Sequence, residues 1–292
     1  MPSRLFCLLQ TLLPHQLLSR GVYLLTRLPL SGLTTLMIRG FVRRYHIDLS
    51  DAAYPDPAHY RTFNQFFTRA LRPGTRRIDA SPHSVACPVD GTVSAAGPID
   101  NNQLFQAKGH HYSLGALLGD PALASRFTNG HFATLYLSPR DYHRVHMPVS
   151  GQLATTVHVP GRLFSVNDAA VQHIPGLFAR NERLVALFDS EAGPIAVILV
   201  GALFVSGIET VWDGAQPHRL FRTPLRRDYP AISAPQLTRG DELGRFNMGS
   251  TVIVLFGAGH VTLDPTLRAG QTVRMGQQLA QFVPTPDHEH RH

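Results

Sequence analysis

Lysine and cysteine are nearly missing from this chain of 292 residues. Lys108 is its only lysine, so arginine carries almost all of the positive charge. The two cysteines, Cys7 and Cys87, lie far apart and form no CxxC pair. This usage argues against a disulfide framework and fits a reducing compartment.

Charged residues are also scarce, at 16 %, whereas hydrophobic residues make up 43 % of the chain. This balance is low in charge for a soluble protein and indicates a large β core or contact with a membrane. The net charge of +7 favours phosphate-bearing partners, either nucleic acid or lipid headgroups. The sequence has no helix-turn-helix, zinc-finger or RRM signature, so we expect no nucleic-acid partner.

The apolar segments near the N-terminus are poor membrane spans. Residues 5–18 are too short and contain Pro14, and residues 21–38 contain Arg27 and Pro29. A signal peptide also fits poorly, because no small-x-small cleavage site follows cleanly. The first 50 residues hold six arginines and one acid, which is typical of helices that lie on an anionic membrane. Ordinary amphipathic helices packed on a core are the alternative.

Aromatic residues at helical spacing follow this region. Phe63, Phe66, Phe67 and Leu71 would share one face of a helix, and such a stripe usually belongs to a core. Four arginines come next and form either a solvated patch or a phosphate site: Arg69, Arg72, Arg76 and Arg77.

From about residue 84 the pattern changes to short β-branched runs between Gly, Pro, Asn and Asp. The most apolar run, residues 194–207, contains two glycines and is expected to form buried strands. Residues 87–99 and 267–282 echo each other weakly, with glycine turns like those of biotinyl and lipoyl carrier domains.

These patterns together predict an α+β fold with two regions. Residues 1–80 are expected to form helices at the membrane interface. Residues 81–292 are expected to form a mostly antiparallel β catalytic core that resembles a barrel-sandwich hybrid. The polar tail is expected to be solvated.

The segment FNMGSTVIVLF, residues 246–256, contains a Gly-Ser-Thr tripeptide at the start of a β-branched strand. Glycine before serine permits a backbone conformation that other residues avoid. It also leaves the Gly249 carbonyl open to attack by the Ser250 hydroxyl, which would give an ester by an N-to-O acyl shift. Removal of the Ser250 α-proton would then eliminate the ester and leave a dehydroalanine, which hydrolyses to a pyruvoyl group. By itself the tripeptide is a weak signal, since turns use Gly-Ser constantly.

Two further segments supply acid–base groups. YLSPRDYHRVHMPVSG, residues 136–151, holds His143 and His146 beside Asp141 and two arginines. Two imidazoles this close suit general acid–base catalysis or metal binding. They share one face in a helix and lie on opposite faces in a strand. Asp90 in PVDGTV is a candidate only if it orients a histidine, because Asp-Gly is above all a turn dipeptide.

Together these three motifs resemble the phosphatidylserine decarboxylase family. FNMGST is similar to the family's self-cleavage motif, usually LGST, with Met248 in place of leucine. YLSPRDYHRVHMP is similar to its histidine motif along the whole length. The resemblance runs from about residue 58 to residue 282, and further segments carry it: residues 60–79, 105–120, 160–167, 178–194 and 207–212.

The resemblance implies that the chain cuts itself between Gly249 and Ser250. The products would be a β chain, residues 1–249, and an α chain, residues 250–292, which stay together as a heterodimer. Ser250 would become a covalent pyruvoyl cofactor, with no metal. In the family this group forms a Schiff base with the substrate amine, which withdraws electrons as CO2 leaves and phosphatidylethanolamine results.

The resemblance also implies a role for each candidate residue. Asp90, His146 and Ser250 resemble the self-cleavage triad, in which His146 acts as base toward Ser250 and Asp90 orients His146. His143 resembles the acid that protonates the product carbanion. A spacing of three residues lets the two histidines exchange these roles.

The partners implied are phosphatidylserine in an anionic membrane and further copies of the heterodimer. The expected location is the cytoplasmic face of the inner membrane, as a peripheral protein.

Two other functions remain open on sequence alone. A zinc-dependent peptidase of the lysostaphin-like kind also uses a β fold and histidines, but it needs an H-x-H pair that occurs here only in the tail. A non-enzymatic lipid-binding or carrier-like module is disfavoured by the clustered Asp, His and Arg residues and by the missing carrier lysine.

Overall fold

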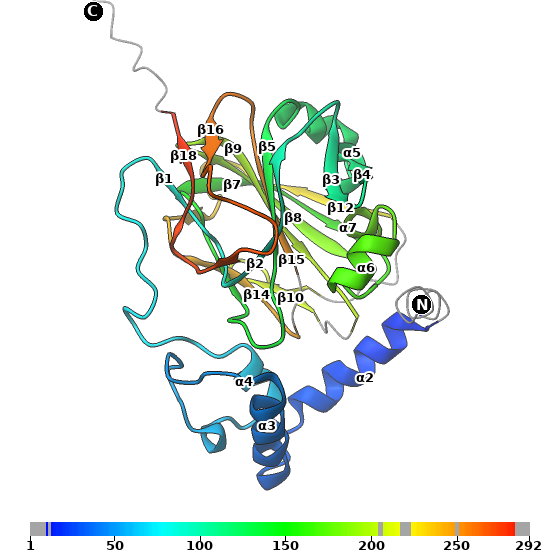
Figure 1. Cartoon of the computed structure of the whole chain (residues 1–292), viewed down its shortest axis with the longest axis vertical. Helices are drawn as coiled ribbons and strands as arrows, with labels where there is room; N and C mark the ends of the chain where they lie inside the picture. Colours follow the sequence, from blue (N-terminus) through cyan, green and yellow to red (C-terminus); the bar gives the residue numbers. More distant parts are fainter. Residues whose placement is uncertain (1–9, 11–12, 204–206, 217–222, 249–250, 284–292) are drawn as a thin grey trace, which may run out of the picture.

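The computed structural model describes residues 10, 13–203, 207–216, 223–248 and 251–283, and it combines N-terminal helices with a large β core (Figure 1). The expected α+β class is confirmed, with mostly antiparallel sheets and no closed barrel in the part described. Figure 1 shows the helices of the first 70 residues below the β core, with α2 rising along one side of it.

The N-terminal helices are α2 (His15–Arg27), α3 (Gly32–Tyr45), the 3-10 turn η1 (Pro57–His59) and α4 (Phe63–Phe67). Pro29 lies in the break between α2 and α3, where the chain bends by 116° over the pair. Within the described residues, neither helix alone is long and apolar enough to cross a membrane; the bent pair passes that test together.

The aromatic stripe forms a small core of its own, as predicted. Phe63, Phe66 and Phe67 are buried on α4, whose first turn is capped by the Thr62 side chain. The helix is shorter than the spacing suggested, because Leu71 pairs instead with Ala52 in an isolated β-bridge. The complete buried set of this cluster, called here the aromatic cluster, is Ile38, Ile47, Tyr60, Phe63, Phe66 and Phe67.

The β core is built on a nine-stranded antiparallel sheet. Its order is β12 (Leu225–Asp228), β7 (Gly151–Val159), β8 (Arg183–Ser190), β9 (Gly193–Val200), β15 (Thr251–Phe256), β5 (His131–Tyr136), β2 (Gly91–Pro98) and β17 (Thr272–Val273), with β13 (Gln236–Leu237) also pairing with β7. Strand β9 covers the first part of the predicted buried run of residues 194–207, of which residues 204–206 lie outside the described residues, and all six residues of β15 are buried beside it. The continuous burial along both strands shows that both faces of the sheet are covered at its middle.

Three smaller sheets and four short helices complete the core within the described residues. The sheets are β11 (Gly214–Gln216), β10 (Ile208–Thr210), β14 (Glu242–Phe246) and β6 (Arg144–His146); β1 (Ser84–Ala86), β18 (Gln278–Phe282) and β16 (Val261–Leu263); and β3 (Gln103–Ala107) with β4 (His110–Ser113). The helices are α5 (Leu114–Leu118), η2 (Pro121–Arg126), α6 (Asp168–His173) and α7 (Leu177–Arg180).

The two segments that echo each other in sequence lie side by side. Strand β2 pairs with β17, and β1 pairs with β18. Between them, the amide of Cys87 donates to the carbonyl of Gln277 and the amide of Gly276 donates to the carbonyl of Cys87. The last strands of the chain are therefore built into the same core as strands from residues 84–98.

Candidate active site

The predicted cleavage bond lies between two strands that are held in different sheets. Strand β14 ends at Phe246, and strand β15 begins at Thr251 as predicted. Gly249 and Ser250 themselves lie outside the described residues. On their far side, Thr251 is 1 % exposed, and its Oγ1 atom has no hydrogen-bond partner in the described structure.

His143 lies next to Phe246, the last residue of β14, and is fully buried. Its carbonyl accepts from the amide of Phe246 at 3.1 Å, and its ring centroid lies 4.0 Å from that of Phe67. The Nδ1 atom lies 2.8 Å from the Asp141 carbonyl, which can only accept, so Nδ1 carries the hydrogen. The Nε2 atom therefore presents its lone pair, and it has no partner among the described residues.

The surroundings keep the His143 imidazole neutral. Burial and, to a lesser extent, the nearby Arg69 guanidinium together lower its pKa to about 3, against the hydrogen bond to the Asp141 carbonyl, which raises it. A neutral imidazole with a bare Nε2 is a proton acceptor, and it becomes a proton donor once it has taken a proton. His143 is thus held in the neutral form that can take up a proton.

His146 is held differently. Its Nδ1 atom donates to the Gly240 carbonyl at 2.8 Å, and its Nε2 atom accepts from the Tyr142 hydroxyl at 3.0 Å. Burial lowers the pKa of His146 and raises that of Tyr142. On strand β6 it faces Glu242, at the far end of β14 from Phe246. The extended backbone puts the two histidines on opposite faces rather than on one helical face.

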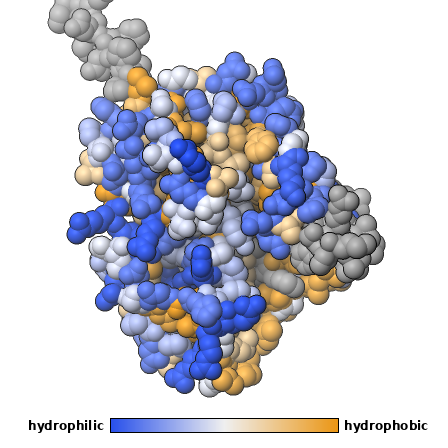
Figure 2. Space-filling model, viewed as in Figure 1, coloured by the Kyte–Doolittle hydropathy of each residue, from blue (hydrophilic) through white to orange (hydrophobic). Residues whose placement is uncertain are grey.

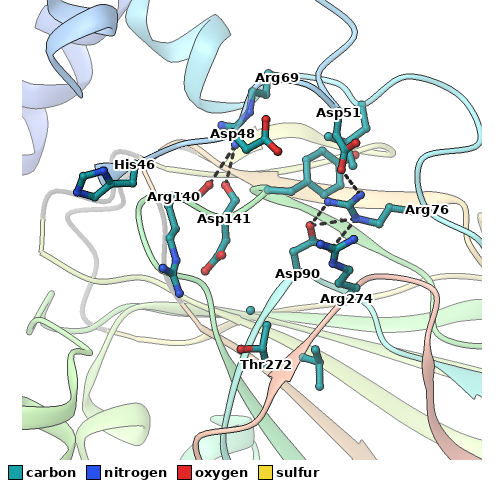
Figure 3. A pocket seen from close by; sticks show the side chains of 14 residues that line it. His46, Asp48, Asp51, Arg69, Arg76, Asp90, Arg140, Asp141, Thr272 and Arg274 are labelled. Carbon is teal, nitrogen blue, oxygen red and sulfur yellow. Dashed lines mark hydrogen bonds and ion pairs between the residues drawn. The ribbon is translucent and has the colours of Figure 1, made fainter. Parts of the chain in front are cut away.

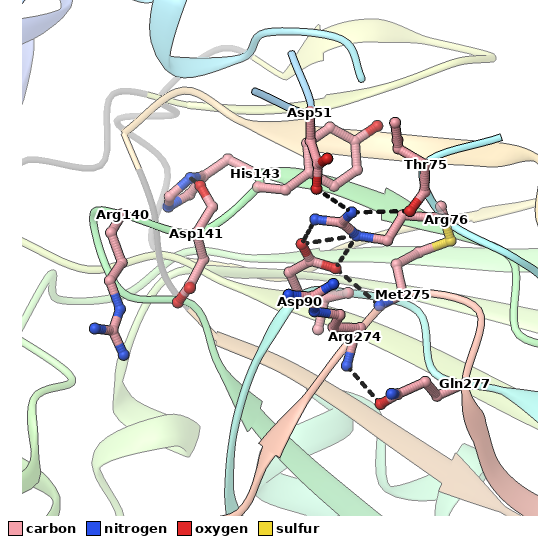
Figure 4. A network of polar contacts seen from close by, with 12 residues as sticks. Asp51, Thr75, Arg76, Asp90, Arg140, Asp141, His143, Arg274, Met275 and Gln277 are labelled. Atoms are coloured by element: carbon pink, nitrogen blue, oxygen red, sulfur yellow. Dashed lines mark hydrogen bonds and ion pairs between the residues drawn. The ribbon is translucent and has the colours of Figure 1, made fainter. Parts of the chain in front are cut away.

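Asp90 does not orient His146, which corrects the prediction from sequence. Both carboxylate oxygens accept from Arg76 Nε at 3.0 Å, and Oδ1 also accepts from the Met275 amide at 2.9 Å (Figure 4). Arg76 holds Asp51 as well, at 2.7 Å. Because both ring nitrogens of His146 are occupied by other groups, Asp90 acts on it through space only, and its negative charge raises the pKa of His146 slightly against the larger effect of burial.

A polar cavity of about 270 Å³ opens beside these residues. Figure 3 shows Asp90, Asp141 and Arg140 around it, with Arg274 and Thr272 contributed by the segment of β17. Arg69 lies at its edge, 5 % exposed, and donates from Nη2 to the carbonyls of Arg140 and Asp141. Arg69 thus fixes the loop that carries the histidines.

The predicted arginine patch divides in two. Arg69 and Arg76 turn inward and serve the site, whereas Arg72 and Arg77 are exposed. The four arginines therefore form neither a wholly solvated patch nor a cluster around one phosphate.

Sequence reasoning missed Arg76 and Tyr142 as site residues. Tyr142 stands inside the quoted histidine motif, but its spacing of four from His146 suggests contact only in a helix. Arg76 had no signal beyond its place in a basic run. The second cysteine, Cys87, is buried, and burial raises its pKa to about 12, in keeping with a structural thiol. In the described part of the chain, no three His, Cys, Asp or Glu side chains are grouped so as to hold a metal ion.

Comparisons with known proteins agree with the motifs. The family model for phosphatidylserine decarboxylase matches residues 63–281, and a model described as PSD matches residues 5–46. The phosphatidylserine decarboxylase proenzyme of Pseudomonas putida strain F1 is 52 % identical over 286 residues, which cover 97 % of this chain and 99 % of the relative. The proteins of the same name from Bordetella petrii and Methylococcus capsulatus are 52 % and 50 % identical over 280 residues, covering 95 % and 96 % of this chain and 97 % of each relative.

Proposed function

Because the chain belongs to the phosphatidylserine decarboxylase family, we propose that it matures by cutting itself between Gly249 and Ser250 and that Ser250 becomes its pyruvoyl cofactor. The enzyme class follows from the family: the protein is a decarboxylase of phospholipid biosynthesis that acts on phosphatidylserine. This membership displaces the zinc peptidase and the lipid-binding module considered above. The word proenzyme in the names of its relatives supports a cleavage step.

The observation that carries the pyruvoyl part of the proposal is the state of His143. This buried, neutral imidazole, whose Nε2 has no partner among the described residues, is bonded through its main chain to the strand that leads into the cleavage segment. On the other side of that segment, Thr251 offers a buried hydroxyl without a partner in the described structure. Unpaired buried polar groups are costly and rare. These two atoms would hydrogen-bond to a small polar group formed from Ser250, so the residues present fit a pyruvoyl group.

Self-cleavage needs a base for the Ser250 hydroxyl proton. In the resulting sequence, Ser250 Oγ bonds to the Gly249 carbonyl carbon, the peptide C–N bond breaks, and an ester and a free amine result. Loss of the Ser250 α-proton then expels the Gly249 carboxylate, and water releases ammonia from the dehydroalanine to leave the keto group.

His146 can serve as this base only through Tyr142. Its Nε2 already accepts the Tyr142 hydroxyl at 3.0 Å, while Nδ1 is fixed by the Gly240 carbonyl. We therefore assign Tyr142 as a relay that takes the proton of Ser250 as it passes its own to His146. The negative charge of Asp90 favours the imidazolium that forms, since Asp90 raises the pKa of His146.

In the decarboxylation reaction the pyruvoyl group supplies an electron sink for the bond to the departing carboxylate. The chain's own residues then manage the proton. We assign to His143 the return of a proton to the carbon that has lost CO2, while Arg69 keeps the 140–143 loop in place. The buried surroundings of His143 limit competing proton transfer from water.

The two predicted chains would not separate after cleavage. Strand β15, the first strand of the α chain, pairs with β5 on one side and β9 on the other. Strands β17 and β18 pair with β2 and β1. A chain with its strands in the middle of the partner's sheet can leave only by unfolding the core, which supports a stable heterodimer. The further assembly into a homo-oligomer stays a prediction.

The N-terminal helices are proposed to rest on the membrane that holds the substrate. Leucines that are about half exposed or more crowd α2, α3 and the turn between them: Leu17, Leu24, Leu25, Leu28, Leu33 and Leu36. Figure 2 shows apolar side chains gathered at the bottom and lower right of the molecule, where Figure 1 places α3 and α2. An apolar surface of this kind bordered by arginines suits the interface of an anionic bilayer. The cytoplasmic face of the inner membrane is the proposed location.

The direct test is the intact mass of the purified protein. We expect two chains, ending at Gly249 and beginning at position 250, with the smaller chain lighter by one ammonia than a serine-headed peptide. Ser250→Ala should stay whole and release no CO2 from phosphatidylserine. A single unmodified chain in active protein would overturn the proposal.

A further inference from the structure

Met248, the residue before Gly249, has a strained backbone. Its φ angle is +77°, in the left-handed region that residues other than glycine and asparagine rarely adopt. Such a conformation persists only where the surrounding structure holds it, and it is often found at functional sites. The contacts of Met248 and of its neighbour Asn247 show what holds it.

The side chain of Met248 is held by the N-terminal region. It packs against the aromatic cluster formed by α3, α4 and the segment between them. The residue thus belongs by sequence to the β core but contacts the core of the helical region. Its thioether side chain fills the irregular surface of the aromatic rings well.

Asn247 is held from three directions. It is 1 % exposed, and its amide donates to the Gly207 carbonyl at 2.9 Å. Its Oδ1 atom accepts from Asn64 of α4 at 2.9 Å, and its Nδ2 atom donates to Glu209 of β10 at 2.8 Å. The side chain can rotate only if buried hydrogen bonds break.

Glu209 extends this arrangement to the surface helix. Its carboxylate lies 3.6 Å from the guanidinium of Arg27 on α2 and 3.9 Å from that of Arg245. Contacts from α4 and α2 therefore reach Asn247 directly or through one carboxylate. Together with the aromatic cluster, they tie the strained residue to the helices that carry the exposed leucines.

We propose that Asn247 and Met248 are positioning residues for self-cleavage, and that the N-terminal helices act as a clamp that holds the strained backbone ahead of the Gly249–Ser250 bond. This inference rests on the proposed self-cleavage. Strain stored in the uncut chain is released when the bond breaks, because the new chain end can relax. The clamp therefore favours cutting and has no further part in the chemistry once the chain is cut.

The test follows cleavage over time in protein made by cell-free synthesis. Asn247→Ala and Met248→Ala should each cut about tenfold more slowly than the parent, the size expected when one buried contact no longer holds the reacting geometry. Asn64→Ala should match Asn247→Ala, and the double variant should be little slower than either. Met248→Leu should restore near-parental cutting, because it keeps the apolar anchor.

Two controls separate positioning from general damage. Gln103→Ala removes an exposed amide on β3, and Leu36→Ala truncates a leucine of α3 that is 66 % exposed and lies outside the aromatic cluster. Both should cut at the parental rate. After long incubation, the matured fraction of each slow variant should release CO2 with the parental kcat.

The possible results distinguish a failure of the clamp from a failure of the proposed self-cleavage. Cutting of Asn247→Ala and Met248→Ala at the parental rate, in a parent that does cut, overturns the clamp and leaves the proposed function standing. A loss in Leu36→Ala as large as in Met248→Ala overturns the role of Met248 as an anchor. A reduced kcat in the matured variants would show damage to the whole site and would also overturn the clamp. A parent that stays whole refutes self-cleavage itself, and the clamp with it.

Discussion

Arg76 holds Asp90 by both carboxylate oxygens, with its Nε 3.0 Å from each and its Nη2 2.5 Å from Oδ2. The side chains are 10 % and 12 % exposed, so this is a nearly buried, bidentate ion pair. Asp90 also accepts the Met275 amide, which lies beyond the predicted cleavage bond. The pair therefore joins the two predicted chains beside the active site.

Loss of Arg76 should destabilise the fold strongly. Arg76→Ala would leave a buried carboxylate without its charge partner, which costs about 3 kcal/mol in comparable cases. The measurement is urea unfolding in a Ser250→Ala background, so that cleavage does not change the sample. Arg77→Ala, an exposed neighbour, is the matched control and should change stability little. Equal stability of the two variants would show that the ion pair between Arg76 and Asp90 contributes nothing to the free energy of unfolding.

The two histidines should separate two activities. His143→Ala should still be cut but should release no CO2, since the proton donor beside residue 250 is gone. His146→Gln and Tyr142→Phe should both be cut roughly 100-fold more slowly, because each breaks the relay to the base. Intact mass over time reports the first activity, and CO2 release from phosphatidylserine vesicles reports the second.

The same experiment can refute either half of this assignment. An uncut His143→Ala would exchange the roles of the histidines. Parental cutting in Tyr142→Phe, beside slow cutting in His146→Gln, would remove the relay and leave a direct role for His146.

Stability should fall as the pH drops through the ordinary range of histidine. Burial lowers the pKa of His143 from 6.5 to about 3, so between these values the unfolded chain binds a proton that the folded chain refuses. The contribution of this residue is therefore unfavourable below pH 6.5 and grows as the pH falls toward 3. Each bound proton of difference changes the free energy of unfolding by about 1.4 kcal/mol per pH unit.

His143→Gln should flatten this dependence, because glutamine does not titrate. Urea unfolding of the Ser250→Ala protein from pH 7 to pH 5, with and without the substitution, gives the comparison. The remaining slope is expected from His15 and His146, whose pKa values are also lowered by burial. An unchanged slope would mean that His143 is not held neutral.

The sequence predicted the local elements of the site well and their contacts less well. The strand that begins at Thr251, the buried run of β9 and the aromatic core of α4 all follow from residue spacing over a few positions. The link between Asp90 and His146 was wrong, because it assumed that three residue types known to act together would touch. Arg76 takes the carboxylate instead, and a nearby guanidinium in a basic run carries no signal of its partner.

The remaining features that the sequence did not predict depend on contacts between residues far apart in the chain. Asn64 and Asn247 are 183 positions apart, and neither belongs to a motif that requires an amide. Met248 looked like a neutral replacement for leucine, and its positive φ could not be inferred from a residue type that normally avoids it. Strain and inter-element hydrogen bonds depend on tertiary packing, which a single sequence shows only where periodicity marks the core.

Membrane binding should depend on the exposed leucines of the N-terminal helices. Leu24 and Leu36 are 65 % and 66 % exposed, and burial of one leucine side chain in a bilayer contributes roughly 2 kcal/mol. Leu24→Glu and Leu36→Glu should each weaken binding to vesicles with anionic lipid by about tenfold or more, as measured by co-sedimentation. Leu225→Glu, on edge strand β12 and 45 % exposed, is the matched control and should bind normally.

The arginines among these leucines predict that vesicle binding in the same assay also depends on lipid charge and on salt. Binding that uses lipid charge should fall on neutral phosphatidylcholine vesicles and as salt rises, whereas burial of leucine alone should respond little to either. The leucine variants should keep the intact mass of the mature chains, because the exposed side chains lie outside the aromatic cluster that contacts Met248. Equal binding of all three variants would show that the protein contacts the membrane through a surface other than α2 and α3.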